Sequence, residues 1–153
     1  MAKKTLASAS DHTEIVQRIA ALTPTAQRRW GSMSVGGMVC HLDDAYRVPL
    51  GELTVKPVKV PVPRSVMKFL ALQIPSPWPK NVQTTEEMRQ GGGGTAPGAF
   101  ATDQARLLDS LERFSACQGL AQIQHAFFGP MSHEDWMRWG YLHADHHLRQ
   151  FSL

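Results

Sequence analysis

Four segments of this chain place apolar residues at helical spacing, and each is bounded by residues that start or stop helices. Apolar residues at i, i+3, i+4 and i+7 line one face of a helix, and that face must be buried against another element. The segments cover residues 11–22, 34–48, 102–117 and 132–150. No repeat and no core-strand pattern accompanies them. We therefore predict an all-α fold, a four-helix bundle.

Local sequence predicts where these helices begin and which faces they bury. The predicted N-caps are Asp11, Ser34, Thr102 and Ser132, because short polar side chains accept hydrogen bonds from the first free backbone N–H groups. The predicted buried stripes of the first three helices are Ile15, Ile19 and Leu22; Val35, Met38, Leu42 and Ala45; and Ala105, Leu108, Leu111 and Phe114. The two glycines after Val35 indicate that another segment approaches this helix closely.

The remaining segments are irregular. Residues 1–10 have the character of a frayed tail. Residues 51–100 form a long insertion, in which valines alternate with lysines and prolines and only residues 64–73 have a helical pattern. Long loops in compact domains are commonly functional. We predict that residues 1–153 are a single domain with a long crossover between the second and third helices.

Composition and charge exclude several classes of partner. Apolar residues make up 42% of the chain and charged residues 19%, which is globular composition. The net charge of +3 comes from scattered lysines and arginines, so we expect no nucleic-acid partner. No run approaches the ~20 apolar residues of a membrane span, and the N-terminal stretch lacks the apolar region of a secretory signal. We expect no membrane partner, a cytoplasmic location and reduced thiols at Cys40 and Cys117.

The C-terminal helix carries two histidines four residues apart, His143 and His147, which therefore lie on one helical face. A third histidine, His41, lies on the apolar stripe of the second helix. The axes of facing helices are about 8–10 Å apart, so imidazoles from both helices can meet at one ion. Neutral imidazole suits Zn, Ni or Fe(II), and three protein ligands leave a position open for water or substrate. The spacing predicts a divalent-metal site.

A simpler interpretation of the same residues stays open. His41 can be a core histidine bonded to a neighbour, and the C-terminal histidines a solvated helix end, where positive charge is favourable. His146 is turned about 100° from His147 and is not predicted as a ligand. Asp44 and His146 are instead candidate catalytic bases. Asp44 or Gln150 can also accept the second ring N–H of a ligating histidine.

Several stretches resemble the DinB/YfiT-like superfamily, and within it one of its functionally uncharacterised bacterial subfamilies. The stretches are RWGSMS at 29–34, CHLDD at 40–44, FFGPMS at 127–132 and HADHHLRQF at 143–151. Residues 79–81 and 100–114 also fit, so the resemblance covers most of the chain.

The resemblance implies a bundle of up-down-down-up topology with a long irregular crossover between helices 2 and 3. It also implies a divalent metal, most often zinc or nickel, held by His41, His143 and His147. Superfamily members with known activity are metal-dependent transferases and isomerases that use a low-molecular-weight thiol. The implied function is a metal-dependent enzyme with a small-molecule substrate.

Three functions remain open from the sequence. The first is a metalloenzyme, similar to a thiol transferase, an isomerase or a hydrolase. The second is a non-catalytic stress protein that binds a metal or a small ligand. The third is a structural module whose apolar surface forms a homodimer.

Overall fold

The computed structural model describes residues 3–153, which form five α-helices and two short 3-10 helices. They are α1 (Ala9–Ala20), α2 (Val35–Arg47), α3 (Arg64–Gln73), η1 (Glu86–Met88), α4 (Phe100–Ala116), η2 (Leu120–Gln122) and α5 (His133–Gln150). Within these described residues the only β feature is an isolated bridge between His125 and Gly129. The prediction of an all-α fold is confirmed.

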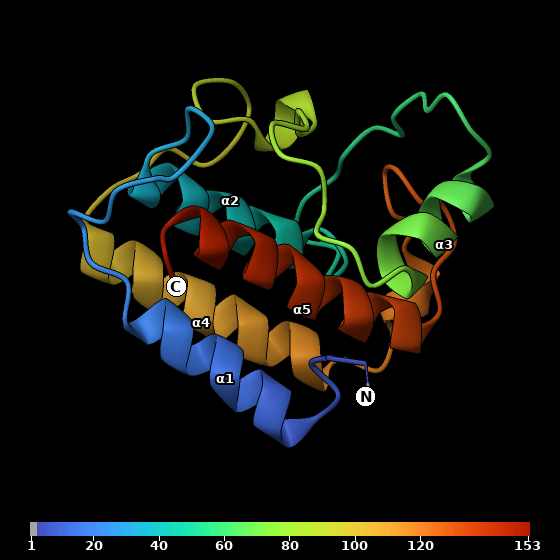
Figure 1. Cartoon of the computed structure of the whole chain (residues 1–153), viewed down its shortest axis with the longest axis horizontal. Coiled ribbons are helices and arrows are strands. Elements are labelled where there is room, and N and C mark those ends of the chain that lie inside the picture. The colour runs from blue at the N-terminus through green and yellow to red at the C-terminus, as the bar shows by residue number, and fades with distance from the viewer. Residues whose placement is uncertain (1–2) are drawn as a thin grey trace.

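The four long helices lie side by side, and α3 stands apart at one end (Figure 1). Helix α2 packs most extensively against α4, whereas α1 contacts both α4 and α5, and α3 contacts α5. The crossover between α2 and α4 lies on one side of the bundle, next to α2 and α5 (Figure 1). None of the described helices is long and apolar enough to cross a membrane.

The core between the long helices is apolar and rich in aromatic rings. The side chains of Tyr46, Phe114 and Trp136 are at most 1% exposed. The Phe114 ring centroid lies 5.0 Å from that of Tyr46 and 6.4 Å from that of Trp136. The Tyr46 hydroxyl donates to the carbonyl of Gly140 at 2.9 Å, so the polar atom of this buried ring has a partner.

The N-caps predicted for α2 and α5 are confirmed. The Ser34 hydroxyl accepts from the N–H of Gly37 at 3.0 Å, and Ser132 forms a capping box with Asp135. The close approach predicted at the start of α2 is also confirmed. A Cβ added to Gly37 would lie 2.0 Å from the side-chain amide oxygen of Gln90, which comes from the loop after η1.

Two helices begin earlier than predicted. Helix α1 starts two residues before Asp11, and the Asp11 carboxylate accepts from the N–H of Thr5 instead of capping the helix. Helix α4 starts two residues before Thr102. There the N-cap is Ala99, which has no side-chain cap, and the side chain of Asp103 accepts instead from the N–H of Gly98, just before the helix, at 2.7 Å.

The buried stripe of α4 also differs from the prediction. Ala105 is exposed and Leu108 is half-buried, whereas Leu107 is completely buried. Leu111 and Phe114 belong to the buried face, as predicted. Two adjacent leucines allow either one to face the core, and the packing of α4 against α2 selects Leu107.

Residues 3–10 do not form the frayed tail that the sequence suggested. The Leu6 side chain is 4% exposed, and its N–H donates to the carbonyl of Met137 in α5 at 3.1 Å. A single buried leucine in a non-periodic segment leaves no pattern that sequence reasoning can detect. The first two residues of the predicted tail lie outside the described part of the chain.

The long crossover is irregular, as predicted, and its predicted helix at residues 64–73 is confirmed as α3. The structure adds η1 in the same segment. Hydrogen bonds from the segment after η1 tie it to α2, because the side-chain amide of Gln90 donates to the Ser34 hydroxyl at 3.0 Å. The irregular chain is therefore anchored to the bundle at defined points.

Replacing Gly140 by Ala is expected to destabilise the fold by about 1–3 kcal/mol, the usual cost of overpacking a core. The added Cβ would lie 2.6 Å from Cε1 of Phe114 and 2.7 Å from Cδ1 of Leu6, and both side chains are buried. Urea unfolding followed by tryptophan fluorescence measures the change. Gly119→Ala is the control, because a Cβ there meets nothing within 4 Å. Equal stability of Gly140→Ala and the wild type would contradict this close packing.

Candidate metal centre

Three histidines from two helices converge in the bundle. His41 comes from α2, and His143 and His147 come from α5; each offers a ring nitrogen, and these nitrogens all lie within 4.8 Å of one another. The Nε2 atoms of His41 and His143 are 3.1 Å apart. The ring centroid of His147 lies 4.8 Å from that of His41 and 5.0 Å from that of His143. The structure thus brings together the three histidines that the sequence singled out.

Gln150 sets the orientation of His147. Its side-chain amide donates from Nε2 to the carbonyl of Trp30 at 2.9 Å, so its Oε1 faces Nδ1 of His147 at 3.0 Å. Because an amide oxygen only accepts, Nδ1 carries the proton and Nε2 keeps its lone pair. Gly31, with φ +77°, makes room for this arrangement, since a Cβ there would lie 2.9 Å from Nε2 of Gln150.

The crossover orients His41 in a similar way. The carbonyl of Met88, at the end of η1, lies 3.5 Å from Nδ1 of His41. This long contact places the proton on Nδ1 and leaves the lone pair on Nε2, which faces His143. Nδ1 of His143 is buried and has no hydrogen-bond partner among the described residues. The Nε2 atoms are therefore the candidate ligand atoms.

Burial keeps the three imidazoles neutral. Loss of hydration lowers the pKa of His41, and it lowers the pKa of His143 and His147 well below the ordinary value. Repulsion between protonated rings acts in the same direction for His143 and His147. Since only neutral imidazole binds a metal, these ligands have no proton to lose near neutral pH.

The donor set fits a divalent ion. Zinc binds imidazole nitrogen at about 2.0–2.1 Å in tetrahedral geometry, which places two such nitrogens about 3.3 Å apart. The 3.1 Å between the Nε2 atoms of His41 and His143 is close to this separation. The group contains no carboxylate or thiolate, so an ion held by it would keep its full charge. The alternative in which the C-terminal histidines form a solvated helix end is excluded, because His143 is buried and His147 is half-buried.

The three histidines line one end of a cavity of about 650 Å³. The rings of Trp139 and Trp78 lie against His143, with centroid distances of 4.9 and 6.0 Å. His146 lines the same cavity between Trp30 and Trp78, at 5.9 and 6.1 Å. Burial lowers the pKa of His146, so this imidazole is also neutral near pH 7.

Asp44 lies outside the lining of the cavity. Its carboxylate accepts from the backbone N–H and the hydroxyl of Thr95 at 2.8 and 2.6 Å, and it faces Arg47 at 3.7 Å. These contacts tie the end of the crossover to α2. They give no support to the expected role of Asp44 as a catalytic base or as a partner of a ligating histidine.

His125 lines the cavity as well, although the sequence suggested no role for it. It forms a tight turn with Gly129, in which each N–H donates to the other residue's carbonyl at 2.8 Å. Its ring stacks on Phe128 at 4.4 Å, and its Nδ1 accepts from the N–H groups of Phe127 and Phe128 at 3.2 and 3.3 Å. The turn thus fixes this ring against the cavity wall.

Sequence reasoning missed the roles of His125 and Met88 at this site for a common reason. Both lie outside the long helices, where no helical period marks a buried face. The Met88 contact is made by a backbone carbonyl, which any residue type can supply. Trp78 also lines the cavity, but the PWP sequence around it did not show that its ring packs against His143.

The fold and the site define a class: an all-α protein with a candidate metal centre of three histidines at one end of a cavity. The chain belongs to the DinB superfamily, whose family model matches residues 8–151. This superfamily includes metal-dependent enzymes. The family assignment made from the sequence is confirmed. No curated protein and no solved structure matches the chain significantly.

Acid should destabilise the fold through His125, because burial lowers its pKa from 6.5 to about 3. Between these values the unfolded chain holds one more proton than the folded protein. Stability is therefore lost as the pH falls through this window, by about 1.4 kcal/mol per pH unit. In the variant His125→Asn, the amide oxygen can accept hydrogen bonds from the same N–H groups of Phe127 and Phe128. The asparagine side chain does not titrate.

The test compares urea unfolding of the metal-free wild type and His125→Asn at pH 7 and pH 5. The free energy of unfolding of the wild type should fall by about 2 kcal/mol more than that of the variant between pH 7 and pH 5. The carboxylates common to both proteins cancel in the difference. Equal losses would show that His125 is protonated as easily in the folded protein as in the unfolded chain.

Proposed function

We propose that this protein is a metal-dependent enzyme, with its ion held by His41, His143 and His147 and a small-molecule substrate bound in the adjoining cavity. The observation that carries the proposal is the convergence of three buried, neutral imidazoles at one end of that cavity. A centre that served stability alone would need no cavity of about 650 Å³ beside it. This volume is within the range of small-molecule sites, roughly 300–1,000 Å³.

A divalent ion in this centre would lower the pKa of a thiol or a water molecule and so supply a nucleophile at neutral pH. The surrounding residues would position the ligands, exclude water and accept a proton. Gln150 holds the His147 ring in place, and the indole rings of Trp78 and Trp139 exclude water from one side of His143. His146, neutral and facing the same cavity, can accept a proton at a ring nitrogen.

The reaction class that we propose first is transfer or isomerisation dependent on a low-molecular-weight thiol, with zinc or nickel as the ion. An ion bound only by neutral nitrogens keeps its positive charge and favours an anionic fourth ligand such as a thiolate. The superfamily analogy points to the same chemistry, although fold alone does not determine a reaction.

Two further features belong to this proposal. The first is the up-down-down-up order of the long helices, supported by the colour gradients in Figure 1, in which α2 and α4 run opposite to α1 and α5. The second is a cytoplasmic location, supported by the free thiols of Cys40 and Cys117. A thiol-dependent reaction also suits a reducing compartment.

Protein reconstituted with zinc or nickel should bind one ion per chain. Replacing any one of the three histidines by alanine should reduce bound metal to near zero after passage through a chelating resin, because only two imidazoles then remain to hold the ion. The variants are His41→Ala, His143→Ala and His147→Ala. Inductively coupled plasma mass spectrometry measures the content. His146→Ala is the matched control and should retain its ion. Unchanged metal in the His41→Ala protein would refute the proposed ligand set.

Catalysis is tested on the same proteins by mixing the metal-loaded form with an electrophile and a panel of low-molecular-weight thiols, and following the loss of thiol. His146→Ala should keep its metal but react at least about a hundredfold more slowly, because a general base typically contributes about 10²–10⁴-fold. A metal-loaded wild type that is inert with every thiol and with hydrolysable esters would indicate a binding protein instead of an enzyme.

Gln150→Leu should weaken metal affinity by about tenfold, because Nδ1–H of His147 loses its acceptor. Gln150→Glu should retain the affinity, since a carboxylate oxygen can accept the same N–H. Competition with a chromophoric chelator measures the affinity, and circular dichroism checks that both variants fold. Equal weakening by both substitutions would show that Gln150 acts through its bond to the Trp30 carbonyl, which neither variant can make, and not through its acceptor.

A further inference from the structure

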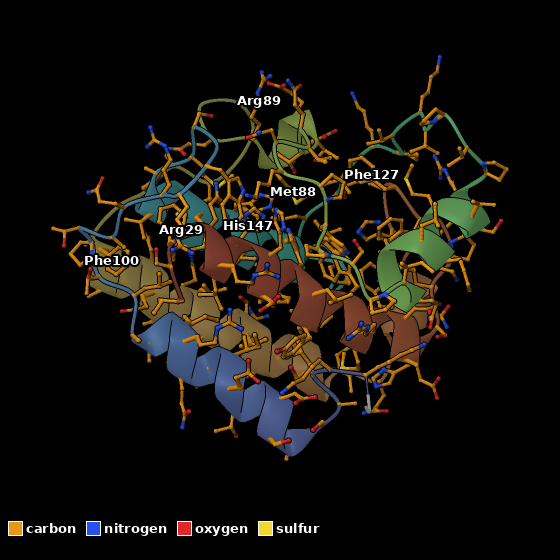
Figure 2. The ribbon with its side chains drawn as sticks, in the orientation of Figure 1. Arg29, Met88, Arg89, Phe100, Phe127 and His147 are labelled. Atoms are coloured by element: carbon orange, nitrogen blue, oxygen red, sulfur yellow. The ribbon has the colours of Figure 1, made fainter. Side chains whose placement is uncertain are left out.

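The cavity beside the three histidines is apolar along most of its wall. Helix α3 contributes Met67 and Leu70, the residue after it contributes Ile74, and the turn after η2 contributes Phe127 and Phe128. Figure 2 places Phe127 toward α3, whereas His147 lies in the last turn of α5, away from α3, so the two ends of the cavity differ in character. One end offers ring nitrogens, and the other offers hydrocarbon.

The charges around the cavity disfavour a cationic ligand. Among the described residues that line it there is no aspartate or glutamate, and the ionisable side chains are five histidines and Lys59. Burial lowers the pKa of His125, His143 and His147, so these rings carry no charge near pH 7. Lys59 is therefore a positive charge on the wall with no negative charge there to balance it.

The apolar wall continues to the protein surface. Leu70, Ile74 and Val82 line the cavity, yet they are 54%, 40% and 64% exposed. The other exposed large apolar residues, Val62, Val66 and Phe69, belong to the same part of the crossover. Contiguous exposed apolar side chains commonly mark a binding site. A ligand in the cavity can thus extend along hydrocarbon to the solvent.

The segment that forms this mouth is also strongly basic. Residues 53–83 contain five lysines and arginines and no acidic residue, whereas the rest of the chain contains eleven basic and thirteen acidic residues. Lys68 is paired with Asp135 of α5 at 2.9 Å. The remaining excess of positive charge around the mouth would attract anions and raise their local concentration.

From this combination we infer that the cavity binds a carboxylic acid with an unbranched apolar chain. The carboxylate lies at the histidine end, and the chain runs along Phe127 and α3 to the mouth. The position of the carboxylate rests on the proposed function, because the proposed ion is the main positive charge at the histidine end of the cavity. The apolar chain depends only on the cavity. The substrate class is then an apolar acid, not a sugar-like or cationic metabolite.

Isothermal titration calorimetry of the full-length, zinc-loaded protein tests the inference. The probes are hexanoate, octanoate and decanoate, used below their micelle concentrations, and the matching alcohols. Each buried methylene should tighten binding by about fourfold. Each acid should bind at least tenfold more tightly than its alcohol, and removal of zinc should reduce this preference.

Two residues of α3 supply a matched pair of variants. Leu70 and Val66 are both exposed and apolar, but only Leu70 lines the cavity. Leu70→Ser should weaken decanoate binding at least fivefold, and Val66→Ser should leave it unchanged. Lys59→Gln should weaken the acids severalfold and the alcohols not at all, and added salt should reduce this difference.

The outcomes separate the inference from the function on which it rests. Affinity that does not depend on chain length, in both zinc-loaded and metal-free protein, would overturn the inference and leave the metal centre intact. Equal affinity for acid and alcohol in the zinc-loaded form would overturn the carboxylate assignment. A protein that binds no zinc but binds decanoate with the expected chain-length dependence would overturn the proposed function alone.

Discussion

The site depends on the close packing of α5 in the bundle, which brings imidazoles from two helices within bonding distance of one another. Gly140 permits this packing, because Phe114 and Leu6 occupy the space that a side chain at this position would need. The Tyr46 hydroxyl of α2 is bonded to the carbonyl of the same residue. His143 follows Gly140 by about one helical turn, so this contact also fixes how deeply His143 lies. A slip of α5 by one turn would move its histidines by about 5.4 Å and separate them from His41.

Buried carboxylates and buried imidazoles are stabilised in different ways in this protein. Asp43 is completely buried, and its charge is met by Arg106 at 2.9 Å and Arg47 at 3.7 Å. Such pairing is the usual way to keep a charge in a low-dielectric interior. His41 and His143 are almost as deeply buried, but they are kept neutral by a lowered pKa instead of by a carboxylate. A divalent ion entering such a centre finds ligands without charge, so an anion from outside is the natural partner for its open position.

The sequence predicts the parts of this structure that are governed by helical periodicity. The stripe that includes Leu42 and the facing histidines His41 and His143 follow from side-chain direction in helices, and both are found as expected. The cap at Ser132 follows from its short polar side chain and is also found. Where two apolar residues are adjacent, as in α4, periodicity alone could not decide which one is buried.

Contacts of the crossover and of the N-terminal segment with the long helices were beyond prediction for a different reason. The bond between Gln90 and Ser34 and the contact between the Met88 carbonyl and His41 join residues about fifty positions apart. Such contacts depend on the path of the whole crossover, which the backbone geometry of each turn determines. Leu6 belongs to the same category, because its burial depends on where the N-terminal segment meets α5.

The crossover therefore has two functional halves. Residues 86–97 are bonded to α2 through Gln90 and Thr95 and contact His41 through Met88, so they support the histidine cluster. Residues 53–83 form the mouth and much of the apolar wall, and they rest on α5 through α3. Changes in residues 53–83 would alter which ligand fits the cavity without moving the three histidines, whereas changes in residues 86–97 would reach the histidine cluster itself. A core of four long helices with one long crossover can in this way keep its histidine cluster constant while the wall of its cavity changes.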